Sequence, residues 1–556
     1  MLVIMVILGT MPLFASFYQF LLVGLHRYRD HYESISDVYP RTAVIVPAWN
    51  EGAVIGATVD RLVQMDYPPE SLRVYVVDDA STDDTPEVLR QKMAEYPGRV
   101  YHIRREKGGQ GKAHTLNHGI HQLLEKTNER LAPVPSPITE SERLPDWRSL
   151  ELVEQTAHVD PSTEEFTRPG MLALGQFAPS WVDLADIVTV ADDDWVEALM
   201  IIDADVIFER DALRKMARHL SDASVGAVTA YIKEGSEPGN YLQKFIGYEY
   251  ITAQAASRRA QNVMGAMFCL AGGAQLHSRQ NLELIGGRID TSSLAEDTFT
   301  TFKTQIEAEK KVYFEGNAIV WAEEPDSIIG LWKQRLRWAR GNVQLTQRFK
   351  SLWFNPKKHK KLGSFSFGFL WFSIFLMPLF MISASVGLVA LYFIDFPLSW
   401  KIFGQFWIFH AINYLFVTLM SFAIDPQTAK RTWVEGFLFP GLISFTIIVY
   451  SVLPRLFEVT LVEGLTAVGW KPASWLVMGV VLFMYAWQGA CMLAAWGIKI
   501  LENTRFKWLN PFLTYMVGFG PILCAVTFHS YIMEAKGAEM KWDKTEKTGK
   551  VRAGMR

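Results

Sequence analysis

The sequence predicts an α/β domain with a parallel-dominated sheet, flanked by transmembrane and interfacial α-helices, and three observations support this. Between residues 40 and 345, short apolar runs alternate with helical patterns, which is typical of parallel strands joined by helices. Long apolar segments lie at the N-terminus and after residue 360. The run Ala198–Ile202 ends in Asp203 and Asp205, at the strand exit where α/β sheets bind ligands.

Composition limits the classes of protein. The length of 556 residues suggests more than one domain. The net charge of −3 shows no basic excess of the kind that nucleic-acid-binding domains carry. The three cysteines are far apart and lack metal-ligand spacing, so we expect buried thiols and no disulfides.

The apolar segments predict membrane helices. Residues 2–25 carry no charge and lack both a basic start and a small-residue cleavage site, which indicates an anchor and not a cleaved signal peptide. Arg27 and Arg29 then favour a cytoplasmic exit. Further spans are expected at about 365–395, 402–424, 435–453, 475–498 and 511–533. If all six spans crossed, the lysine-rich tail would end outside, against the positive-inside rule. One later segment is therefore expected to be interfacial or re-entrant, and the span count stays open.

These segments divide the chain into four predicted regions. They are an N-terminal transmembrane anchor (1–29), a cytoplasmic domain (30–360), a transmembrane helical region (361–535) and a short basic tail (536–556). Within the cytoplasmic domain, the alternation of strand and helix patterns stops at residues 127–190, which are rich in proline and acidic residues. We therefore expect a surface insertion there, which could contact partner proteins. Asp192–Asp194 precedes a strand and is expected to be a solvated loop.

The strands are predicted in the following order: 42–47, 73–77, 100–103, 198–202, 225–230 and 312–314. The first leads into the polar turn Ala48–Gly52, and the second ends in Asp78 and Asp79. After the third, the glycine-rich stretch Lys107–Lys112 precedes a helix and can approach phosphates closely, although it matches neither a Walker A nor a Rossmann pattern.

Three motifs carry candidate chemistry. Asp203 and Asp205 can share one hard cation, Mg²⁺ or Mn²⁺, that holds a diphosphate, while the simpler interpretation is an acidic loop after a strand. Glu296 and Asp297 follow a glycine turn. A third set of side chains shares one helix face by its spacing: Gln334, Arg337 and Trp338. His114, His118 and His121 also share a face, but no nearby cysteine or carboxylate completes a ligand set.

Taken together, these motifs resemble those of processive family-2 glycosyltransferases, the membrane synthases of cellulose, hyaluronan, chitin and poly-N-acetylglucosamine. The resemblance rests on the order and approximate spacing of Val46–Glu51, Val77–Asp83, Gly109–Lys112, Asp203–Asp205, Glu296–Asp297 and Gln334–Trp338. It covers about residues 40–345 and implies a GT-A-type cytoplasmic glycosyltransferase domain. It also implies an integral protein of a bacterial inner membrane, with membrane lipid around it.

The resemblance implies roles for the matching residues. Asp79 would contact uracil with Asp78 nearby, and Lys112 would hold the nucleotide. Asp203 would contact nucleotide and metal, Asp205 the metal, and Asp297 would be the general base beside Glu296. Gln334, Arg337 and Trp338 would form the acceptor and diphosphate end. The implied reaction is inverting transfer of a sugar from a UDP-sugar onto a β-linked polysaccharide, which is then translocated.

Two other functions stay open. One is a non-processive transferase that places a single sugar on a lipid carrier. The other is a catalytically inactive membrane scaffold or transporter, against which the intact carboxylates argue. Only a short tail follows the last apolar segment, so the cyclic-di-GMP-binding domain usual in bacterial cellulose synthases is not expected there, which favours the other branches. The donor sugar cannot be read from these motifs.

Overall fold

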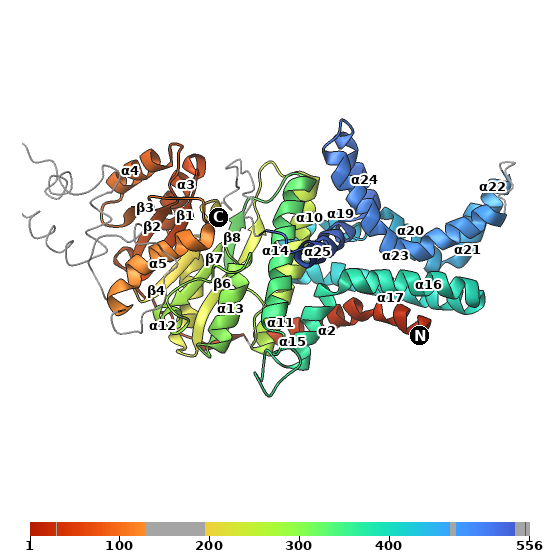
Figure 1. Cartoon of the computed structure of the whole chain (residues 1–556), viewed down its shortest axis with the longest axis horizontal. Coiled ribbons are helices and arrows are strands. Elements are labelled where there is room, and N and C mark those ends of the chain that lie inside the picture. Colours follow the sequence, from red (N-terminus) through yellow and green to blue (C-terminus); the bar gives the residue numbers. More distant parts are fainter. Residues whose placement is uncertain (29, 129–194, 468–473, 540–550, 552–556) are drawn as a thin grey trace, which may run out of the picture. The chain divides into compact units, whose positions relative to one another are not determined.

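The computed structural model describes residues 1–28, 30–128, 195–467, 474–539 and 551. The chain divides into two compact units (Figure 1). The sheet unit contains Asp30–Glu237 and Gly265–Glu323, and the helical unit contains Met1–Arg29, Pro238–Met264 and Glu324–Glu546. Beyond its first two residues, the predicted insertion at 127–190 lies outside the described residues, as does Asp192–Asp194.

The sheet unit is built on eight strands in the order β3-β2-β1-β4-β7-β6-β8-β5. Their bounds are β1 Thr42–Ala48, β2 Leu72–Asp78, β3 Val100–Arg104, β4 Ala198–Ile202, β5 Val206–Phe208, β6 Val225–Glu234, β7 Ala274–Ser278 and β8 Lys311–Ala322. Four of the pairings between neighbours are parallel and three are antiparallel. The sheet is thus mixed: three of the parallel pairings join β1 to β4, and the fourth joins β6 to β8.

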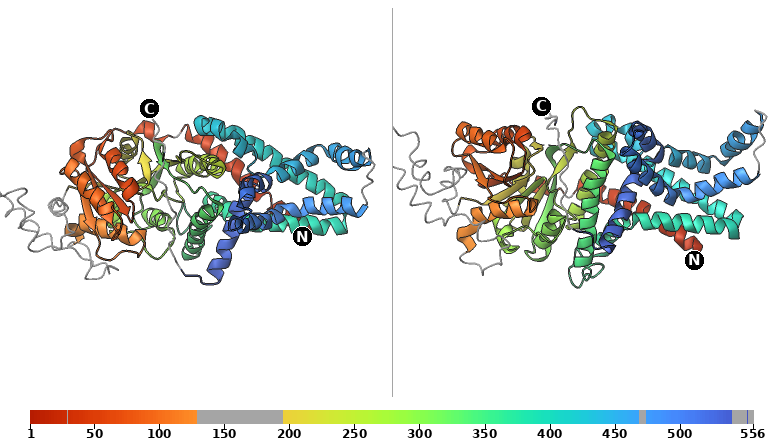
Figure 2. Two further views of the ribbon diagram at one scale, coloured as in Figure 1. Left: turned by 90° about the horizontal axis from the view of Figure 1, so that it is seen from above. Right: turned by 45° about the horizontal axis from the view of Figure 1, so that its top comes forward.

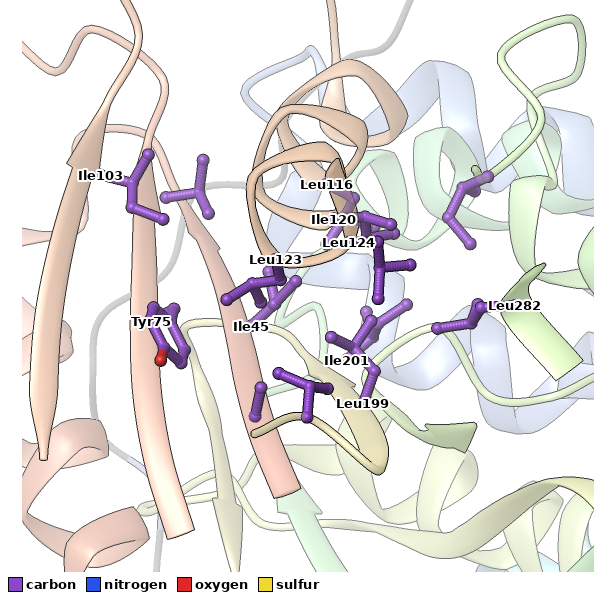
Figure 3. Close-up of a cluster of buried hydrophobic side chains, with 14 of the residues drawn as sticks. Ile45, Tyr75, Ile103, Leu116, Ile120, Leu123, Leu124, Leu199, Ile201 and Leu282 are labelled. Atoms are coloured by element: carbon purple, nitrogen blue, oxygen red, sulfur yellow. The ribbon is translucent and has the colours of Figure 1, made fainter. Parts of the chain in front are cut away.

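The predicted strands form because their apolar runs are buried on both faces. Every residue of β4 is buried, as expected for a continuous apolar run in an interior strand, here between the parallel β1 and the antiparallel β7. Helix α5 packs over β1 and β2, and its leucines and isoleucines meet those of the strands in one cluster (Figure 3). The main helices of this unit are α3 Gly52–Val63, α4 Thr85–Glu95, α5 Lys112–Asn128, α9 Ala212–Arg218, α12 Arg279–Leu284 and α13 Glu296–Ile306.

The strand register brings several chain segments to one edge of the sheet. In the parallel pair β1–β2, Ala48 lies opposite Asp78, so both strands end together. Strand β4 runs parallel to β1 and ends at the same edge. Strand β7 is antiparallel to β4, with Ala274 opposite Ile202, so β7 begins at the edge where β4 ends. The polar segments after β1, β2 and β4 and before β7 therefore share this edge.

The helical unit consists of helices from three parts of the sequence. They are α1 Leu2–Leu8, α2 Met11–His26, α10 Tyr241–Tyr250, α11 Ser257–Met264, α14 Ile328–Arg348, α15 Phe365–Phe375, α16 Met377–Ile394, α17 Phe396–Ile424, α18 Pro426–Arg431, α19 Trp433–Phe437, α20 Leu442–Val452, α21 Pro454–Phe457, α22 Gly464–Ala467, α23 Ser474–Glu502, α24 Asn510–Val517 and α25 Phe519–Ala535. Helix α16 packs against α1, α17 and α23 (Figure 2).

Several of these helices are long and apolar enough to cross a membrane. Within the described residues there are four, the N-terminal segment from Leu2, α16, α17 and α23, or six if each of two bent pairs counts as one span. The bent pairs are α20 with the helix from Pro454, at 109°, and the helix ending at Val517 with α25, at 100°. A bent pair is either a broken span or a re-entrant loop, so the expectation of an interfacial or re-entrant later segment stays a prediction.

Three predicted spans are broken where the sequence analysis expected continuous helices. The apolar segment 365–395 forms α15 and α16, because Pro378 stands at the start of α16 and cannot continue the preceding helix. The segment 435–453 forms α19 and α20. Segment 511–533 bends at Gly518, whose φ of 101° suits only glycine and whose added Cβ would meet the backbone of Pro440.

We predict that Ile120→Ala in α5 destabilises the sheet unit by about 2–5 kcal/mol, because Ile120 is fully buried in the cluster of Figure 3. Thermal or denaturant unfolding of the purified protein measures the effect. Gln91→Ala, at an exposed position of α4, is the control and should change stability by less than about 0.5 kcal/mol. Equal effects of the two substitutions would show that this cluster does not stabilise the unit.

Candidate active site

Asp78 ends β2 with its carboxylate fully buried and satisfied by hydrogen bonds. The amide of Ser81 donates to Oδ1 at 2.7 Å, and Nε2 of His102 lies 3.2 Å from Oδ2. Burial raises the pKa of Asp78, but these hydrogen bonds outweigh burial and hold the pKa below its usual range. Asp78 therefore shapes the turn after β2 and is not itself exposed to a ligand.

Asp79 is also buried, and it fixes the glycine-rich loop before α5. Its Oδ1 is paired with the guanidinium of Arg105, and its Oδ2 accepts the amide of Gly109 at 2.8 Å. Arg105 also donates to Gln110 at 2.7 Å. A Cβ at Gly108 would overlap the carbonyl of Asp79, and Gly109 has a φ of 87°, so both positions require glycine.

The turn after β1 is tied to the turn after β2. Asn50 has a φ of 53°, in the left-handed region that asparagine adopts more readily than most residues. Its amide donates to Ser81 Oγ at 2.9 Å, and its Oδ1 accepts the amide of Thr82 at 2.8 Å. The polar turn Ala48–Gly52 and the segment after Asp79 thus form one connected wall of the sheet edge.

Lys112, the first residue of α5, joins this wall to the opposite side. Its ammonium donates to the carbonyl of Gly272 at 2.9 Å, is paired with the carboxylate of Asp203, and lies 4.0 Å from Glu296. Burial lowers the pKa of Lys112, but the carboxylates around it outweigh burial and raise the pKa above its usual range. The nearly buried ammonium stays charged and holds acidic groups from separate segments together.

Asp203 and Asp205 follow β4, and both side chains are half-buried. Among the described residues, no group of three or more histidine, cysteine or acidic side chains could hold a metal ion. Mg²⁺ sites often take one or two carboxylates and complete their shell with substrate phosphates and water. The two carboxylates therefore fit a cation shared with a diphosphate and do not fit an all-protein metal site.

Asp297 lies in the first turn of α13, directly after Glu296. Its Oδ1 accepts the backbone amide of Thr298 at 2.7 Å and the hydroxyl of Thr298 at 3.2 Å. A Cβ at Gly272 would stand 3.1 Å from Oδ2 of Asp297 and 3.5 Å from the ammonium of Lys112, so glycine there leaves room beside both groups. One carboxylate oxygen is held in place while the other faces the Gly272 turn.

The three residues predicted to share a face do lie on one helix, α14, in the helical unit. Gln334 is buried and donates to Glu324 at 3.0 Å, and the hydroxyl of Tyr250 donates to the same carboxylate at 2.5 Å. Arg337 is partly exposed. The side chain of Trp338 is 37% exposed. The motif thus combines a buried amide with an accessible indole ring.

The ring of Trp338 rests on a buried arginine. The guanidinium of Arg335 lies 4.2 Å from the centroid of Trp338, within cation–π range, and donates to Glu249 at 2.9 Å. Burial raises the pKa of Glu249; Arg335 opposes this shift, and Glu324 adds to it. Glu249 of α10 therefore holds the Arg335 guanidinium beneath the ring, and the same helix supplies Tyr250.

The structure brings Asp78, Asp79, Lys112, Asp203, Asp205, Glu296 and Asp297 to one edge of the sheet, and it places Gln334, Arg337 and Trp338 on α14. Three further residues at these sites were not predicted from the sequence: Arg105, Glu324 and Arg335. Arg105 lies two positions after the predicted strand 100–103 and directly after β3, a position from which its role could have been suspected. Glu324 carries no sequence signal of its own, since its role depends on contacts with Gln334 and Tyr250.

Comparison of the sequence with models of known protein families gives a match. A model described as "Glycosyltransferase like family 2" matches residues 40–341. The chain is 27% identical over 335 residues to a beta-monoglucosyldiacylglycerol synthase from Synechocystis sp., covering 59% of this chain and 54% of that protein. It is 24% identical over 323 residues to a poly-beta-1,6-N-acetyl-D-glucosamine synthase from Staphylococcus epidermidis, covering 57% of this chain and 68% of that protein. The match thus spans about half the length of the first of these relatives.

Among solved structures, one match has limited similarity to this chain. It is the mannosyltransferase PcManGT from Pyrobaculum calidifontis in complex with GDP-Man and Mn²⁺, with a TM-score of 0.44 and 19% identity. The alignment covers 81% of this chain and 99% of that one.

We predict that His102→Phe moves acid unfolding of the protein to higher pH. Because the folded-state pKa of Asp78 is below its ordinary value of 3.8, its stabilisation is present above that value and is lost as the pH falls through the folded-state pKa. Loss of the His102 hydrogen bond raises the folded-state pKa, so the loss begins at higher pH. Near-UV circular dichroism across a pH titration measures the midpoint. His102→Gln, which can still donate, should shift the midpoint less, and an unchanged midpoint in both variants would refute the assignment.

Proposed function

The chain belongs to glycosyltransferase family 2, whose model matches more than half of its residues, and from this premise we propose that it is a membrane polysaccharide synthase. It would transfer a sugar from a UDP-sugar onto a growing β-linked polysaccharide and pass the product across the membrane. The match confirms the predicted family, the GT-A-type fold and the enzyme class, an inverting glycosyltransferase. The donor, the processive mode, the translocation and the membrane location are our proposals.

The observation that carries the proposal is the grouping around Lys112. One ammonium holds Asp203 and the Gly272 carbonyl, with Glu296 at 4.0 Å, at the carboxyl edge of β1, β2 and β4. Its raised pKa, to which Asp297 also contributes, keeps the ammonium charged. Four segments that are far apart in sequence thus converge on charges suited to a nucleotide-sugar.

We assign the donor end of the reaction to these residues. Asp79, held by Arg105 and by the amide of Gly109, would contact the uracil, with Asp78 shaping the turn behind it. Lys112 and Asp203 would hold the diphosphate end. Asp203 and Asp205 would hold Mg²⁺ or Mn²⁺, and such a cation, when bound, supplies positive charge that neutralises the leaving diphosphate.

Asp297 is the residue we assign as the general base. It would take the proton of the acceptor hydroxyl as that oxygen bonds to the anomeric carbon. The bond from that carbon to the diphosphate breaks in the same displacement, and UDP leaves with the electron pair. A single displacement inverts the anomeric centre, so an α-linked donor gives a β-linked product. Thr298 fixes one oxygen of Asp297, which leaves the other to accept the proton.

The residues on α14 would serve the acceptor. Trp338 presents an exposed ring on which a terminal sugar can stack, and the Arg335 guanidinium beneath it fixes its plane. Gln334 and Arg337 take the acceptor and diphosphate roles that the resemblance implies. The apolar helices of the helical unit would cross the membrane and carry the product, with the catalytic domain on the cytoplasmic side. Polymerisation is favoured because this motif accompanies it in the synthases that the sequence resembles.

A second candidate is a transferase that places one sugar on a lipid, and similarity to the glycolipid synthase from Synechocystis sp. favours it. One experiment separates the two. The purified full-length protein is given a panel of UDP-sugars with Mg²⁺ or Mn²⁺, and UDP release and product size are measured. We expect one donor to give UDP and a long polymer, and a chelator to stop both. A single-sugar lipid product would favour the second candidate, whereas no UDP release with any donor would contradict both.

We predict that Asp297→Asn lowers turnover by about 10²–10⁴, the usual contribution of a positioned base, while UDP binding persists. UDP release and UDP affinity are measured on the same preparation. Asp290→Asn is a matched control, because Asp290 only caps a nearby turn by accepting from Ser292 at 2.7 Å. Its turnover should stay near wild type. If Asp297→Asn loses UDP binding as severely as turnover, Asp297 is a nucleotide-binding or structural residue instead.

We predict that Trp338→Ala impairs elongation far more than UDP binding, since stacking of a sugar end on the ring is worth about 1–3 kcal/mol by analogy with base stacking. Trp338→Phe should keep part of the activity. Polymer length, UDP release and UDP affinity are the measurements. Trp433→Ala removes another exposed indole of the helical unit and should leave all three unchanged. Polymer of normal length and rate from Trp338→Ala would disprove the acceptor role.

A further inference from the structure

A dense basic segment, residues 349–364, joins α14 to α15 in the helical unit (Figure 1). It contains Lys357, Lys358, Lys360 and Lys361 within five positions, with His359 between them. The sequence has no aspartate or glutamate from residue 327 to residue 394. Local sequence therefore offers these lysines no opposite charge, although clustered like charges repel one another.

The segment has a defined fold in spite of this repulsion. Successive turns close through backbone hydrogen bonds, including Lys358 to Asn355 at 3.0 Å and Gly363 to His359 at 2.8 Å. Leu352 and Leu362 are buried and anchor the two ends. The lysines between them are exposed. Within the described part of the chain, Lys357 and Lys360 make no hydrogen bond or ion pair, so their ammonium groups are available to an outside anion.

Exposed aromatic rings stand beside the lysines. The side chain of Phe365 is 73% exposed and that of Phe354 is 48% exposed. Phe354 contacts Phe365 with ring centroids at 6.0 Å and stacks on Phe372 at 5.6 Å. Large apolar side chains next to exposed cations are the pattern by which proteins bind membrane surfaces, where phosphates meet the acyl region.

The backbone holds Phe354 in this position at a cost. Its φ of 56° lies in the left-handed region, which a bulky residue rarely adopts and which is unfavourable by about 1–3 kcal/mol. Gly368 of α15 makes room for the ring, because a Cβ there would stand 2.6 Å from Phe354. A strained residue held against a neighbouring helix, with its ring half outside, indicates a binding role for that ring.

Helix α15 supports the same conclusion. It is apolar but has only 11 residues, too few to cross the hydrocarbon core and typical of a helix that lies in the interface. Phe365 begins this helix, so the lysine cluster leads directly into an apolar interfacial element. Along the chain, the lysines are followed by the apolar residues of α15, as the charged headgroups of a lipid leaflet are followed by its acyl chains.

We propose that residues 354–365 bind the headgroups of anionic phospholipids. The four lysines contact the phosphates, and Phe354 and Phe365 enter the boundary of the acyl region. The inference rests on the proposed membrane location of the helical unit, but not on the proposed reaction. It names a lipid class and a surface that the catalytic proposal does not require.

The test uses full-length protein reconstituted in phosphatidylcholine vesicles with trace spin-labelled phosphatidylglycerol or phosphatidylcholine. Electron spin resonance gives the relative association of the two lipids with the protein. We expect wild type to prefer phosphatidylglycerol and Lys→Gln at 357, 358, 360 and 361 to lower that preference about fivefold or more, given the usual contribution of a lysine near an anionic surface. Lys→Arg at the same positions should retain the preference, and 0.5 M salt should weaken it in wild type.

Two further variants separate charge from apolar contact. Lys→Gln at 541, 544, 547 and 550 removes the same charge from the C-terminal sequence and should leave the preference unchanged. Phe365→Ser should reduce the amount of associated lipid without changing the ratio of the two lipids. If the loop variant keeps the preference, or both quadruple variants lose it equally, the proposed surface is wrong. If soluble polyphosphate displaces phosphatidylglycerol and binds with the same affinity, the surface is a general polyanion site and the proposed lipid site is also wrong.

Transferase activity is followed in the same vesicles. The loop residues are outside the proposed catalytic machinery, so UDP release in pure phosphatidylcholine should be the same for wild type and the loop variant. Absence of UDP release in every variant, together with an intact lipid preference, would refute the proposed function and leave the lipid surface standing. If wild type releases UDP normally but shows no preference for phosphatidylglycerol, the lipid surface is refuted and the proposed function stands.

Discussion

The ion pair between Lys112 and Asp203 is the contact on which the arrangement of the candidate site depends. Lys112 is almost buried, and a buried ammonium is unfavourable unless anions and hydrogen-bond acceptors surround it. Asp203 and the carbonyl of Gly272 supply these groups directly, and Glu296 lies nearby. Because each comes from a different segment, satisfying this one charge fixes the start of α5, the end of β4, the turn before β7 and the start of α13 relative to one another.

A second buried network, next to the first, shapes the loop that leads into α5. Asp79 and Arg105 are both buried, so each needs the other to remain charged. Their pairing places the acceptor oxygen of Asp79 against the amide of Gly109. The glycines follow from this geometry, since Gly108 passes too close to the Asp79 carbonyl for any side chain. Contacts within the protein therefore define the shape of this loop.

The parts of the structure that follow from local sequence were predictable. The strand at 198–202 was predicted because every residue in it is apolar, and Asp203 and Asp205 then had to leave the sheet. Arg105 escaped prediction because its partner lies 26 positions earlier, and the two meet only through the parallel pairing of β2 with β3. The bend at Gly518 was missed for a similar reason, since hydropathy measures length and apolarity, while this bend depends on the backbone of Pro440.

The helical unit shows why a motif must be considered with the residues that support it. Gln334 and Trp338 were predicted from their spacing on one face, yet the residues that orient them are Glu324, Glu249 and Arg335. Arg335 is buried between Glu249 and the ring of Trp338, so loss of Glu249 would leave an uncompensated cation under that ring. Glu324 likewise binds Gln334 and Tyr250 with its two oxygens. The exposed ring of Trp338 is therefore held by buried charges from α10 and from the segment before α14. Under the proposed function, a flat surface fixed in this way would position the terminal sugar without specific contacts to it, as an acceptor whose end is renewed after each addition requires.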